Sequence, residues 1–584
     1  MTSFYNHLLW FTVLFTFFLF SLTMSFYVTY INEAFYVSLN LFSLWNNDMS
    51  VRFYFDFMSV WFTTVILLIS SIIMVYSYFY MAPYRKSVYF LWLTNLFIFS
   101  MLMVVNIRNL FFLMLGWDGL GLVSFFLIVY YQNQRSITSG IFTLLINRLG
   151  DSFFLVTITL FFYAYSDLTM FTSNLTTSLV LCMLLLTFMT KSAIFPFSPW
   201  LPLAIAAPTP ISALVHSSTL VTAGLYLMMR FSYLLYSSYS LMQLLLVLSL
   251  FTSFYAGINS IFEKDLKKMI ALSTLSHLGF IGIAFSAGLL QLAFFHILTH
   301  ALFKSLLFMT IGDIIINLNH SQDIRYLSSG MLYTPMSCIV MYVSILNLLG
   351  IPNISGYFSK DLVLEIINYS WLSPVVLSVL FLNVFFTYYY TYQLVFYSFQ
   401  PIKVLPYQNF HAPSLLHTLC LLLIALSTLG FGYFFMRHIC PFILFYPVPS
   451  LNKWLPLCIS LVMLLHLFLN AKLFTSNNPT LNYYFSNMMY LSNVILRAAS
   501  NLHYNLSFML VKSLEIGVLR FSLNAYTKLT LTELTRQIFD VSMLNPIKLV
   551  LWSFPLLSAL VVLILLNNIS LLYMIVTHRI SLRI

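Results

Sequence analysis

The feature that most constrains this chain is a series of apolar runs, each about 20 residues long and nearly free of charge. A helix of that length crosses the roughly 30 Å hydrocarbon layer of a lipid bilayer. Of the 584 residues, 61% are hydrophobic and only 7% are charged, whereas charged residues make up roughly a quarter of a soluble chain. The sequence therefore predicts an all-α polytopic membrane protein with about 15–16 transmembrane helices.

Several other features narrow the class of protein. The first apolar run, NHLLWFTVLFTFFLFSLTMSF, lacks a preceding basic segment and a small-residue cleavage site, so we expect a retained span and not a signal peptide. The net charge of +11 is more typical of membrane topology and anionic lipid than of nucleic-acid binding. No CxxC motif or Cys/His cluster occurs, so the sequence predicts neither an iron–sulfur nor a zinc site. The five scattered cysteines are Cys182, Cys338, Cys420, Cys440 and Cys458.

Two segments interrupt the apolar pattern, KSAIFPFSPWLPLAIAAPTP at 191–210 and GIPNISGYFSKD at 350–361. Proline removes a helical donor and collides with the preceding turn, so a helix must break or end in each segment. Irregular backbone at membrane depth persists only where protein or a water-filled cavity satisfies it. A pair of interrupted helices, one in each half, points to the working sites of a transporter.

Ionisable side chains inside the apolar runs are the strongest functional signal. They are Asp118, Arg148, Asp151, Lys191, His216, His296, His300, Lys304, Asp313, Lys360 and Asp361. Each costs several kcal/mol in a membrane and normally lines a bundle interior or a wet cavity. A single one could be a structural ion pair, but a set of both signs with histidines between them is typical of a proton relay. Because burial disfavours a charged lysine and a nearby carboxylate favours it, Asp118 and Lys191 are one candidate couple.

The stretch FFHILTHALFKSLLF places His296, His300 and Lys304 four residues apart, so they form one stripe on a helix. Two histidines at this spacing could also hold a metal ion, but HEXXH is absent and Lys304 would repel a cation. A passive hydrogen-bonded pair in the core is a further alternative. A proton-conducting row explains the stripe best.

The C-terminal part has a different pattern, which completes the expected domain organisation. From about Ser486, charged residues recur too often for a span but suit an amphipathic helix at a membrane interface. An apolar run then returns to the membrane, so the long helix reads as a strap across neighbouring subunits. The expected parts are N-terminal transmembrane helices at 1–107, a proton-translocating core at 108–400, C-terminal transmembrane helices at 401–485, a lateral amphipathic helix at 486–545 and an anchor helix at 546–584.

Six motifs carry a resemblance to a known family: GWDGLGLVSF, NRLGD, KSAIFPFSPWLPLAIAAPTPISALVHSSTLVTAGLYL, KDLKKMIALSTLSHLGF, FHILTHALFKSLLF and GYFSKD. The chain closely resembles the largest antiporter-like membrane subunits of mitochondrial respiratory complex I. The resemblance implies two inverted five-helix bundles, each with a broken helix, and a lateral helix with a terminal anchor.

The resemblance also implies roles for matching positions. Asp118 falls where the family has the carboxylate that partners the broken-helix Lys191, although most members carry Glu there. Central-axis positions are matched by Lys267, His296, His300 and Lys304. The second broken helix is matched by Lys360 and Asp361, and Arg148, Asp151 and His216 match further family positions.

The implied function is proton translocation across the mitochondrial inner membrane by a multi-pass subunit, coupled to electron transfer from NADH to ubiquinone. That electron transfer is expected in other subunits, which would carry FMN and iron–sulfur clusters, while this chain binds no cofactor. Expected partners are membrane lipids and other subunits of the complex, especially antiporter-like subunits under the lateral helix, and no nucleic acid. A stand-alone cation/proton antiporter is the alternative, and a scaffold whose charges only hold helices together is a third hypothesis.

Overall fold

The computed structural model describes residues 2–31, 33–44, 47–82, 87–164, 174–318, 320–328, 334–369, 374–399, 414–439 and 479–491, and the single residues 458, 494 and 497. The chain divides into two compact units, Met1–Ser492 and Asn493–Ile584. The described fold is that of the first unit. The anchor helix expected at 546–584, nearly all of the lateral helix expected at 486–545, and much of the region of C-terminal transmembrane helices expected at 401–485 lie outside the described residues.

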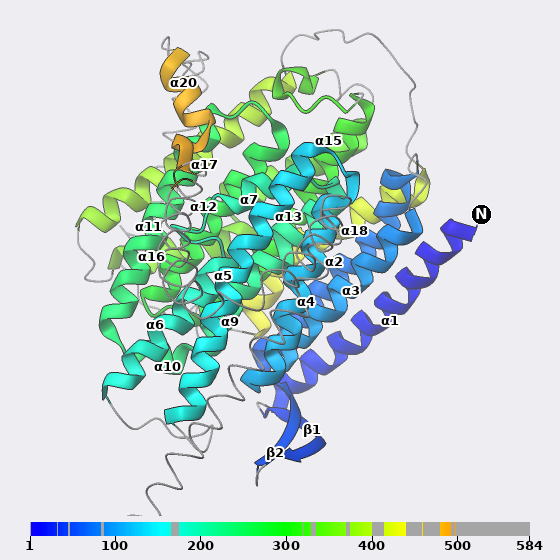
Figure 1. The fold of residues 1–584 in the computed structure, drawn as a ribbon. Coiled ribbons are helices and arrows are strands. Elements are labelled where there is room, and N and C mark those ends of the chain that lie inside the picture. Colours follow the sequence, from blue (N-terminus) through cyan, green and yellow to red (C-terminus); the bar gives the residue numbers. More distant parts are fainter. Residues whose placement is uncertain are drawn as a thin grey trace, which may run out of the picture. The chain divides into compact units, whose positions relative to one another are not determined.

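The first unit is a bundle of helices, and eleven helical segments in its described residues are long and apolar enough to cross a membrane (Figure 1). The long helices are α1 (Thr2–Ile31), α2 (Phe57–Met81), α3 (Ser87–Asn106), α4 (Leu110–Ile128), α5 (Gln134–Ala164), α11 (Tyr239–Phe262), α12 (Leu266–Ser286), α13 (Leu290–Asn317), α17 (Pro374–Phe399) and α18 (Leu415–Phe434). A further span, Thr209–Arg230, is composite. The expected helical membrane fold is thereby confirmed.

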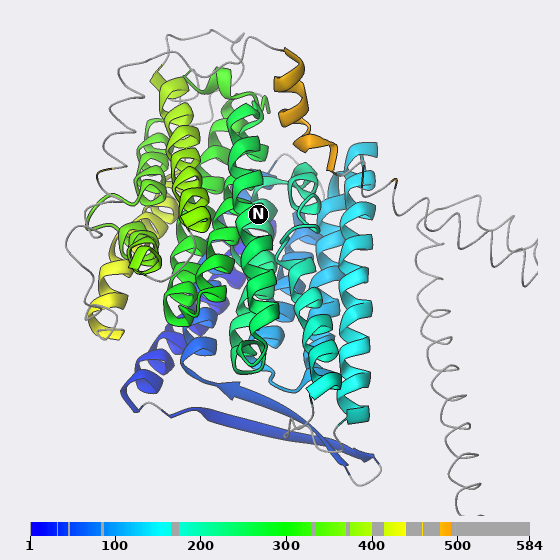
Figure 2. The same cartoon turned by 90° about the vertical axis from the view of Figure 1, so that its left-hand side faces the viewer.

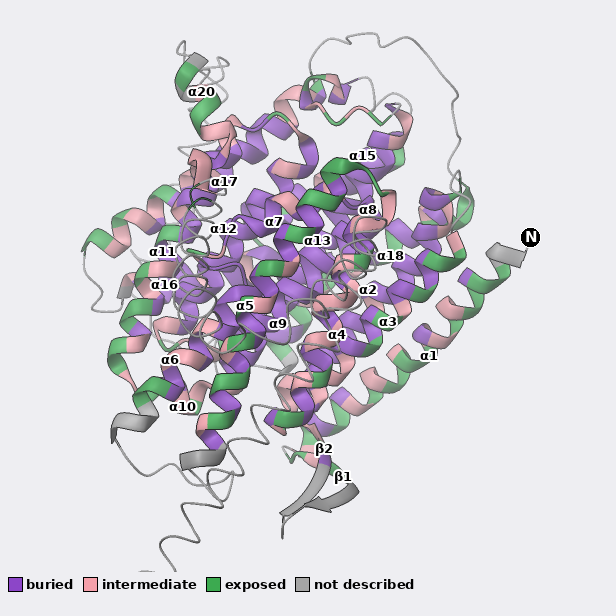
Figure 3. Cartoon of the chain, viewed as in Figure 1, coloured by how far each residue is buried: buried purple, intermediate pink, exposed green. Residues whose placement is uncertain are grey.

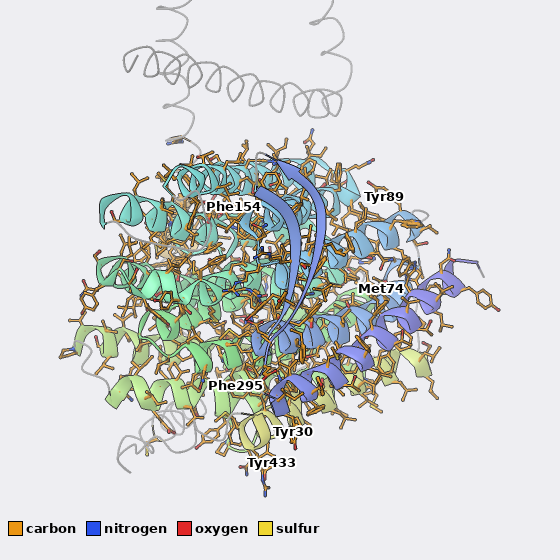
Figure 4. All side chains as sticks on the ribbon, turned by 90° about the horizontal axis from the view of Figure 1, so that it is seen from below. Tyr30, Met74, Tyr89, Phe154, Phe295 and Tyr433 are labelled. Atoms are coloured by element: carbon orange, nitrogen blue, oxygen red, sulfur yellow. The ribbon has the colours of Figure 1, made fainter. Side chains whose placement is uncertain are left out.

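Burial increases toward the middle of the bundle, where α13 is buried on all sides over most of its length (Figure 3). By contrast, few residues of α1 are buried. Seen from below in Figure 4, Met74, Phe154 and Phe295 lie among the helices, and Tyr89 and Tyr433 project from the rim. A bundle in lipid requires this arrangement, because hydrocarbon solvates the outer apolar faces and leaves the protected interior for polar groups.

A β-hairpin follows α1 and was not predicted from the sequence (Figure 2). Its strands, β1 (Phe35–Leu44) and β2 (Asn47–Phe55), pair antiparallel with an irregularity between Asn40 and Phe42. Just after β2, Asp56 caps α2 by accepting a hydrogen bond from the Ser59 backbone at 3.0 Å, and the Ser59 hydroxyl accepts one from the Asp56 backbone at 2.9 Å. The hairpin thus leads directly into a well-fixed start of the first central helix.

Both interruptions predicted from proline and glycine are present, and each follows a short apolar helix. The first follows α6 (Asn174–Lys191), which ends at the predicted lysine. The second follows α15 (Pro335–Leu349), where Gly350 takes a left-handed conformation with φ 77°. Each interruption leads into a π-helix, η3 (Ser212–Thr219) or η5 (Tyr357–Asp361), and π-turns inside helices are frequent at functional sites.

Short elements complete the first unit. Between α6 and η3 the chain forms α7 (Trp200–Leu203), η2 (Ala204–Ala206) and α8 (Thr209–Ile211), and η3 continues into α9 (Leu220–Arg230). The remaining elements are η1 (Val129–Tyr131), α10 (Ser232–Tyr236), η4 (Ile324–Tyr326), α16 (Leu362–Tyr369), η6 (Phe435–Ile439), α20 (Pro479–Ser486) and η8 (Met488–Tyr490).

A close contact between α6 and α9 fixes the end of α6. A Cβ atom at Gly224 would lie only 2.6 Å from the Phe188 carbonyl oxygen and 2.8 Å from the Ser192 backbone nitrogen. Only glycine permits this approach, since backbone atoms cannot move aside as a flexible side chain could. The contact holds the residues on either side of Lys191 in place.

Candidate functional site

Three charged residues gather where α4 meets α5. Arg148 Nη1 lies 3.6 Å from Asp118 Oδ2 and 3.2 Å from Asp151 Oδ2. Arg148 and Asp151 are one turn apart on α5, and Asp118 comes from α4, so one guanidinium joins two carboxylates from neighbouring helices. Asp151 is almost inaccessible, whereas the Asp118 side chain is 32% exposed. The sequence did not identify this three-residue network, although it singled out all three members.

Lys191 lies beside this network but is not ion-paired with it. Its ammonium group donates a hydrogen bond to the Trp117 carbonyl and stands 3.8 Å from the centre of the Trp117 ring. The expected partner, Asp118, is the next residue along α4, and in the described part of the chain no carboxylate lies within 4.0 Å of the Lys191 ammonium. Asp118 and Asp151 nevertheless both interact electrostatically with it. The structure thus brings the predicted couple into one cluster and interposes a backbone carbonyl.

His216 and Lys267 lie further along the interior. His216 is on the π-helix η3, is 1% exposed and has no hydrogen-bond partner at either ring nitrogen among the described residues. Lys267 is in the first turn of α12 and points its ammonium at the Ala207 carbonyl, 3.5 Å away in the first interruption. Lys267 therefore faces the broken segment that the prolines predict, and the His216 ring lies 6.4 Å from that of Trp200 in the same segment.

The stripe of His296, His300 and Lys304 lies on α13 and is wholly buried. Lys304 donates to the Ser273 hydroxyl at 2.7 Å, and His296 Nδ1 is 3.0 Å from the Ser359 hydroxyl of η5. Within the described ranges, no group of three or more histidine, cysteine or acidic side chains could hold a metal ion. The stripe thus contacts α12 at one end and the second interruption at the other.

Lys360 and Asp361 occupy the last two positions of η5. The Lys360 ammonium donates to the Leu348 carbonyl at 3.1 Å and to the Thr387 hydroxyl at 3.0 Å. Asp361 packs against the end of α15, where a Cβ atom at Gly350 would lie 3.1 Å from Asp361 Oδ1. Lys191 is the last residue of the helix before the first interruption, whereas Lys360 lies after the second interruption.

Asp313 has a partner that the sequence did not reveal. Its Oδ1 atom lies 3.1 Å from His417 Nε2 of α18, and both side chains are 8% exposed. The pair joins α13 to α18 at a distance from the stripe, since Asp313 stands nine residues beyond Lys304 on the helix. The sequence signal for His417 was a histidine in the apolar run LLHTLC, which is too weak to assign a partner.

Two more interior residues escaped the sequence interpretation, His277 of α12 and Tyr390 of α17. Both are buried, and their hydrogen bonds and ring contacts connect them to the stripe. A signal for His277 was present, because it is an ionisable side chain inside the motif KDLKKMIALSTLSHLGF. No comparable signal marks Tyr390, which lies in the tyrosine-rich stretch TYYYTY.

A helical bundle with two broken helices and a buried row of lysines and histidines defines an antiporter-like membrane subunit. Family comparison agrees: residues 107–387 match the family described as NADH:quinone oxidoreductase/Mrp antiporter, TM, and residues 42–90 match NADH-Ubiquinone oxidoreductase (complex I), chain 5 N-terminus.

Individual relatives agree with this class, and two solved structures share the fold. NADH-ubiquinone oxidoreductase chain 5 of Anopheles gambiae is 39% identical over 467 residues, which cover 78% of this chain and 80% of the relative. Its namesake in Anopheles arabiensis is 45% identical over 347 residues, covering 58% and 90%. The Mrp complex from Dietzia sp. DQ12-45-1b superposes with a TM-score of 0.64 at 21% identity, covering 85% of this chain and 59% of that one. The archaeal membrane-bound sulfane sulfur reductase superposes with a TM-score of 0.60 at 22% identity, covering 71% of this chain and 85% of that one. At these identities the two structures support the fold alone.

This chain belongs to the NADH-ubiquinone oxidoreductase chain 5 family. It is a multi-pass, proton-translocating subunit of mitochondrial complex I in the inner membrane, as the resemblance in its motifs predicted. The family assignment favours this function over the stand-alone antiporter and the scaffold.

Proposed function

We propose that protons cross this subunit along the buried row that begins near Lys191 and ends near Lys360. The row includes Asp118, Arg148, Asp151, Lys191, His216, Lys267, His296, His300, Lys304, Lys360 and Asp361. Its two ends lie at the two interrupted helices, where irregular backbone brings carbonyl groups into the interior.

The observation that carries the proposal is the state of four buried lysines. Lys191, Lys267, Lys304 and Lys360 are each at most 5% exposed. In the described part of the chain none of them forms an ion pair within 4.0 Å, and each ammonium donates only to a carbonyl or a hydroxyl group. A purely structural buried charge is normally paired, because an unpaired one is costly. Lysines that are buried, hydrogen-bonded and unpaired can exist in both protonation states, as a relay requires.

Carboxylates at both ends would control the charge on the terminal lysines. Asp118 and Asp151 interact electrostatically with Lys191, and Asp361 with Lys360. A change in the position or charge of these carboxylates would favour or disfavour a proton on the neighbouring lysine. Arg148, which holds Asp118 and Asp151 together, is the natural element for such a change at the first end.

Redox chemistry belongs, in this proposal, to other subunits of the complex. They would carry FMN and iron–sulfur clusters, oxidise NADH and reduce ubiquinone, while this chain moves protons. The support is the sequence, whose five cysteines form no cluster-binding motif.

Neighbouring antiporter-like subunits and lipid would contact the segment that follows Ser486. At its start the chain is fixed to α11, where the Tyr255 hydroxyl donates to the Met488 carbonyl at 2.6 Å. A chain truncated before Ser486 should still insert its bundle but yield less assembled complex on blue-native electrophoresis. A normal amount of fully active complex from this truncation would contradict the proposal that the segment after Ser486 holds neighbouring subunits together.

Substitution of Lys304 by two different residues tests the relay. Lys304→Met removes the charge, and Lys304→Arg keeps a charge that cannot be released as a proton. The relay predicts that both variants assemble and that both lose proton translocation. A structural role predicts instead that arginine is tolerated, so normal proton flux in Lys304→Arg would contradict the proposed function.

A further inference from the structure

Three histidines from two helices form a closed triangle in the centre of the bundle. His277 of α12 has its ring centre 5.6 Å from that of His296 and 5.7 Å from that of His300, and the two rings on α13 are 6.3 Å apart. All three side chains are at most 3% exposed. His277 is therefore as much a part of the interior row as the two histidines of the stripe.

The hydrogen bonds of this triangle run through His277. Its Nδ1 atom lies 3.4 Å from His296 Nε2, and its Nε2 atom lies 3.4 Å from the Tyr390 hydroxyl. His296 in turn contacts the Ser359 hydroxyl at 3.0 Å through Nδ1. One choice of ring tautomers satisfies all three contacts: Tyr390 donates to His277, His277 to His296, and His296 to Ser359.

His300 takes no part in this series of hydrogen bonds. Neither of its ring nitrogens has a hydrogen-bond partner in the described residues, although it precedes Lys304 by one turn. The spacing along α13 would suggest a direct path from Lys304 through His300 to His296. The contacts instead connect His296 to a tyrosine of a third helix, α17, by way of α12.

Each end of this series of hydrogen bonds lies near a buried lysine. Lys304 Nζ lies 5.9 Å from the centre of the Tyr390 ring and is held on the Ser273 hydroxyl. At the other end, Ser359 immediately precedes Lys360 on η5. The Ser273 hydroxyl that accepts from Lys304 also interacts with the Tyr390 side chain, so Ser273 connects the lysine to the tyrosine.

We propose that His277, with Tyr390, is the proton-transfer link between Lys304 and the second interrupted helix. This inference rests on the proposed function and adds two residues that the sequence analysis did not single out. His277 is a proton carrier because its ring can accept at one nitrogen and release from the other. Tyr390 gives up its hydroxyl proton as it receives another.

The transfer balances atom by atom. A proton from the Lys304 side reaches the Tyr390 oxygen as the Tyr390 proton passes to His277 Nε2. His277, now cationic, releases its Nδ1 proton to His296 Nε2, and His296 releases its Nδ1 proton toward the Ser359 side. One proton enters and one leaves, no net charge remains, and each imidazole ends as the other tautomer. Return to the starting tautomers requires a ring rotation or passage in reverse.

Two conservative variants in the assembled complex test this link. His277→Gln keeps an amide of similar reach that cannot carry a proton, and Tyr390→Phe removes one hydroxyl group. The matched controls are Ser276→Ala, next to His277 and, among the described residues, bonded only within its own helix, and Tyr389→Phe, which packs in a separate apolar cluster. The readouts are the amount of complex, NADH:ubiquinone turnover and protons translocated per NADH.

Each test variant should assemble normally and lose about tenfold or more of its proton-coupled turnover, as expected when a positioned proton donor or acceptor is removed. The double variant should lose little more than either single variant, because both act in one path. In the remaining turnover the solvent deuterium isotope effect should rise, which a packing defect would not cause.

Lys304→Met, measured on the same membranes, separates the two proposals. If Lys304→Met abolishes pumping while both His277→Gln and Tyr390→Phe pump like their controls, the His277 link is wrong and the relay stands. If Lys304→Met itself pumps normally, the proposed function fails first. Should His277→Gln fail to assemble, Tyr390→Phe alone decides.

Discussion

The Lys191 ammonium stands 3.8 Å from the centre of the Trp117 ring, and it donates a hydrogen bond to the Trp117 carbonyl. The aromatic face and the carbonyl dipole both favour the charged lysine without neutralising it. Asp118, one residue along, is bound to Arg148 at 3.6 Å. A rearrangement of Arg148 would therefore change the charge environment of Lys191 without breaking any direct contact of the lysine.

Asp118 variants test whether charge or length matters at this end of the row. Asp118→Glu should retain most activity, since it keeps the carboxylate within reach of Arg148. Asp118→Asn should lower proton flux and coupled turnover sharply at normal complex abundance, because it removes one of the negative charges that favour a proton on Lys191. Assembly and proton flux are to be measured on the same membranes. Poor assembly with normal specific activity would favour a structural role for Asp118.

Lys360→Met should block pumping more than it harms assembly. Methionine has a similar length, but the substitution leaves Asp361 buried without the adjacent positive charge, which is destabilising in itself. The double variant Lys360→Met/Asp361→Asn removes that burden. It should recover assembly and not pumping, and recovery of both proton uptake and NADH oxidation would remove Lys360 from the relay.

The Asp313–His417 pair should be important for stability and not for proton flux. His417→Ala removes the group that forms an ion pair with the buried Asp313 carboxylate, and breaking a buried pair typically costs about 3–5 kcal/mol. Thermal denaturation of the complex should show this loss, and Asp313→Asn in the same chain should restore much of it. Specific proton flux in the surviving complex should be unchanged, and a selective loss of flux would place the pair on the proton path.

The stability of the folded protein should fall as the pH rises toward the pKa of Glu263, a residue that lies just outside the spans at the end of α11. Burial, with a smaller contribution from Asp265, raises the pKa of Glu263 to about 7, despite the opposing charge of Lys268. Between roughly pH 4.5 and 7 the folded protein therefore binds more protons than the unfolded chain. The stability that the protonated Glu263 contributes is lost across this window, and it amounts to on the order of 1–3 kcal/mol. Glu263→Gln should flatten the pH dependence of thermal stability. A pH profile of Glu263→Gln identical to that of the unsubstituted protein would contradict the assignment.

Patterns local in the sequence predicted the fold and much of the row. Prolines between Pro196 and Pro210 and glycines around Gly350 located both interruptions, because their effect on a helix is local. Spacing of four residues placed His296, His300 and Lys304 on one face for the same reason. The hairpin was missed because the sequence was read for apolar runs of about 20 residues, and its strands of 10 and 9 residues are too short to appear as such runs.

Partners across the bundle could not be predicted in this way. His277 and Tyr390 are 113 residues apart in the chain, and their contact depends on how α12 and α17 pack. Lys191 illustrates a second limit, since its hydrogen-bond acceptor is a backbone carbonyl, which every residue possesses. A search for carboxylates in the sequence therefore led to Asp118, the right region with a different contact.

Two consecutive lysines allow the most direct test of the relay. Lys267 is 5% exposed and unpaired in the described residues, whereas Lys268 is partly exposed and forms an ion pair with Asp265 at 3.2 Å. The measurement is the number of protons translocated per NADH oxidised by assembled complex in sealed vesicles, for Lys267→Met and Lys268→Met. The account predicts a clear loss for Lys267→Met and the unsubstituted ratio for Lys268→Met, and equal ratios in the two variants would contradict it.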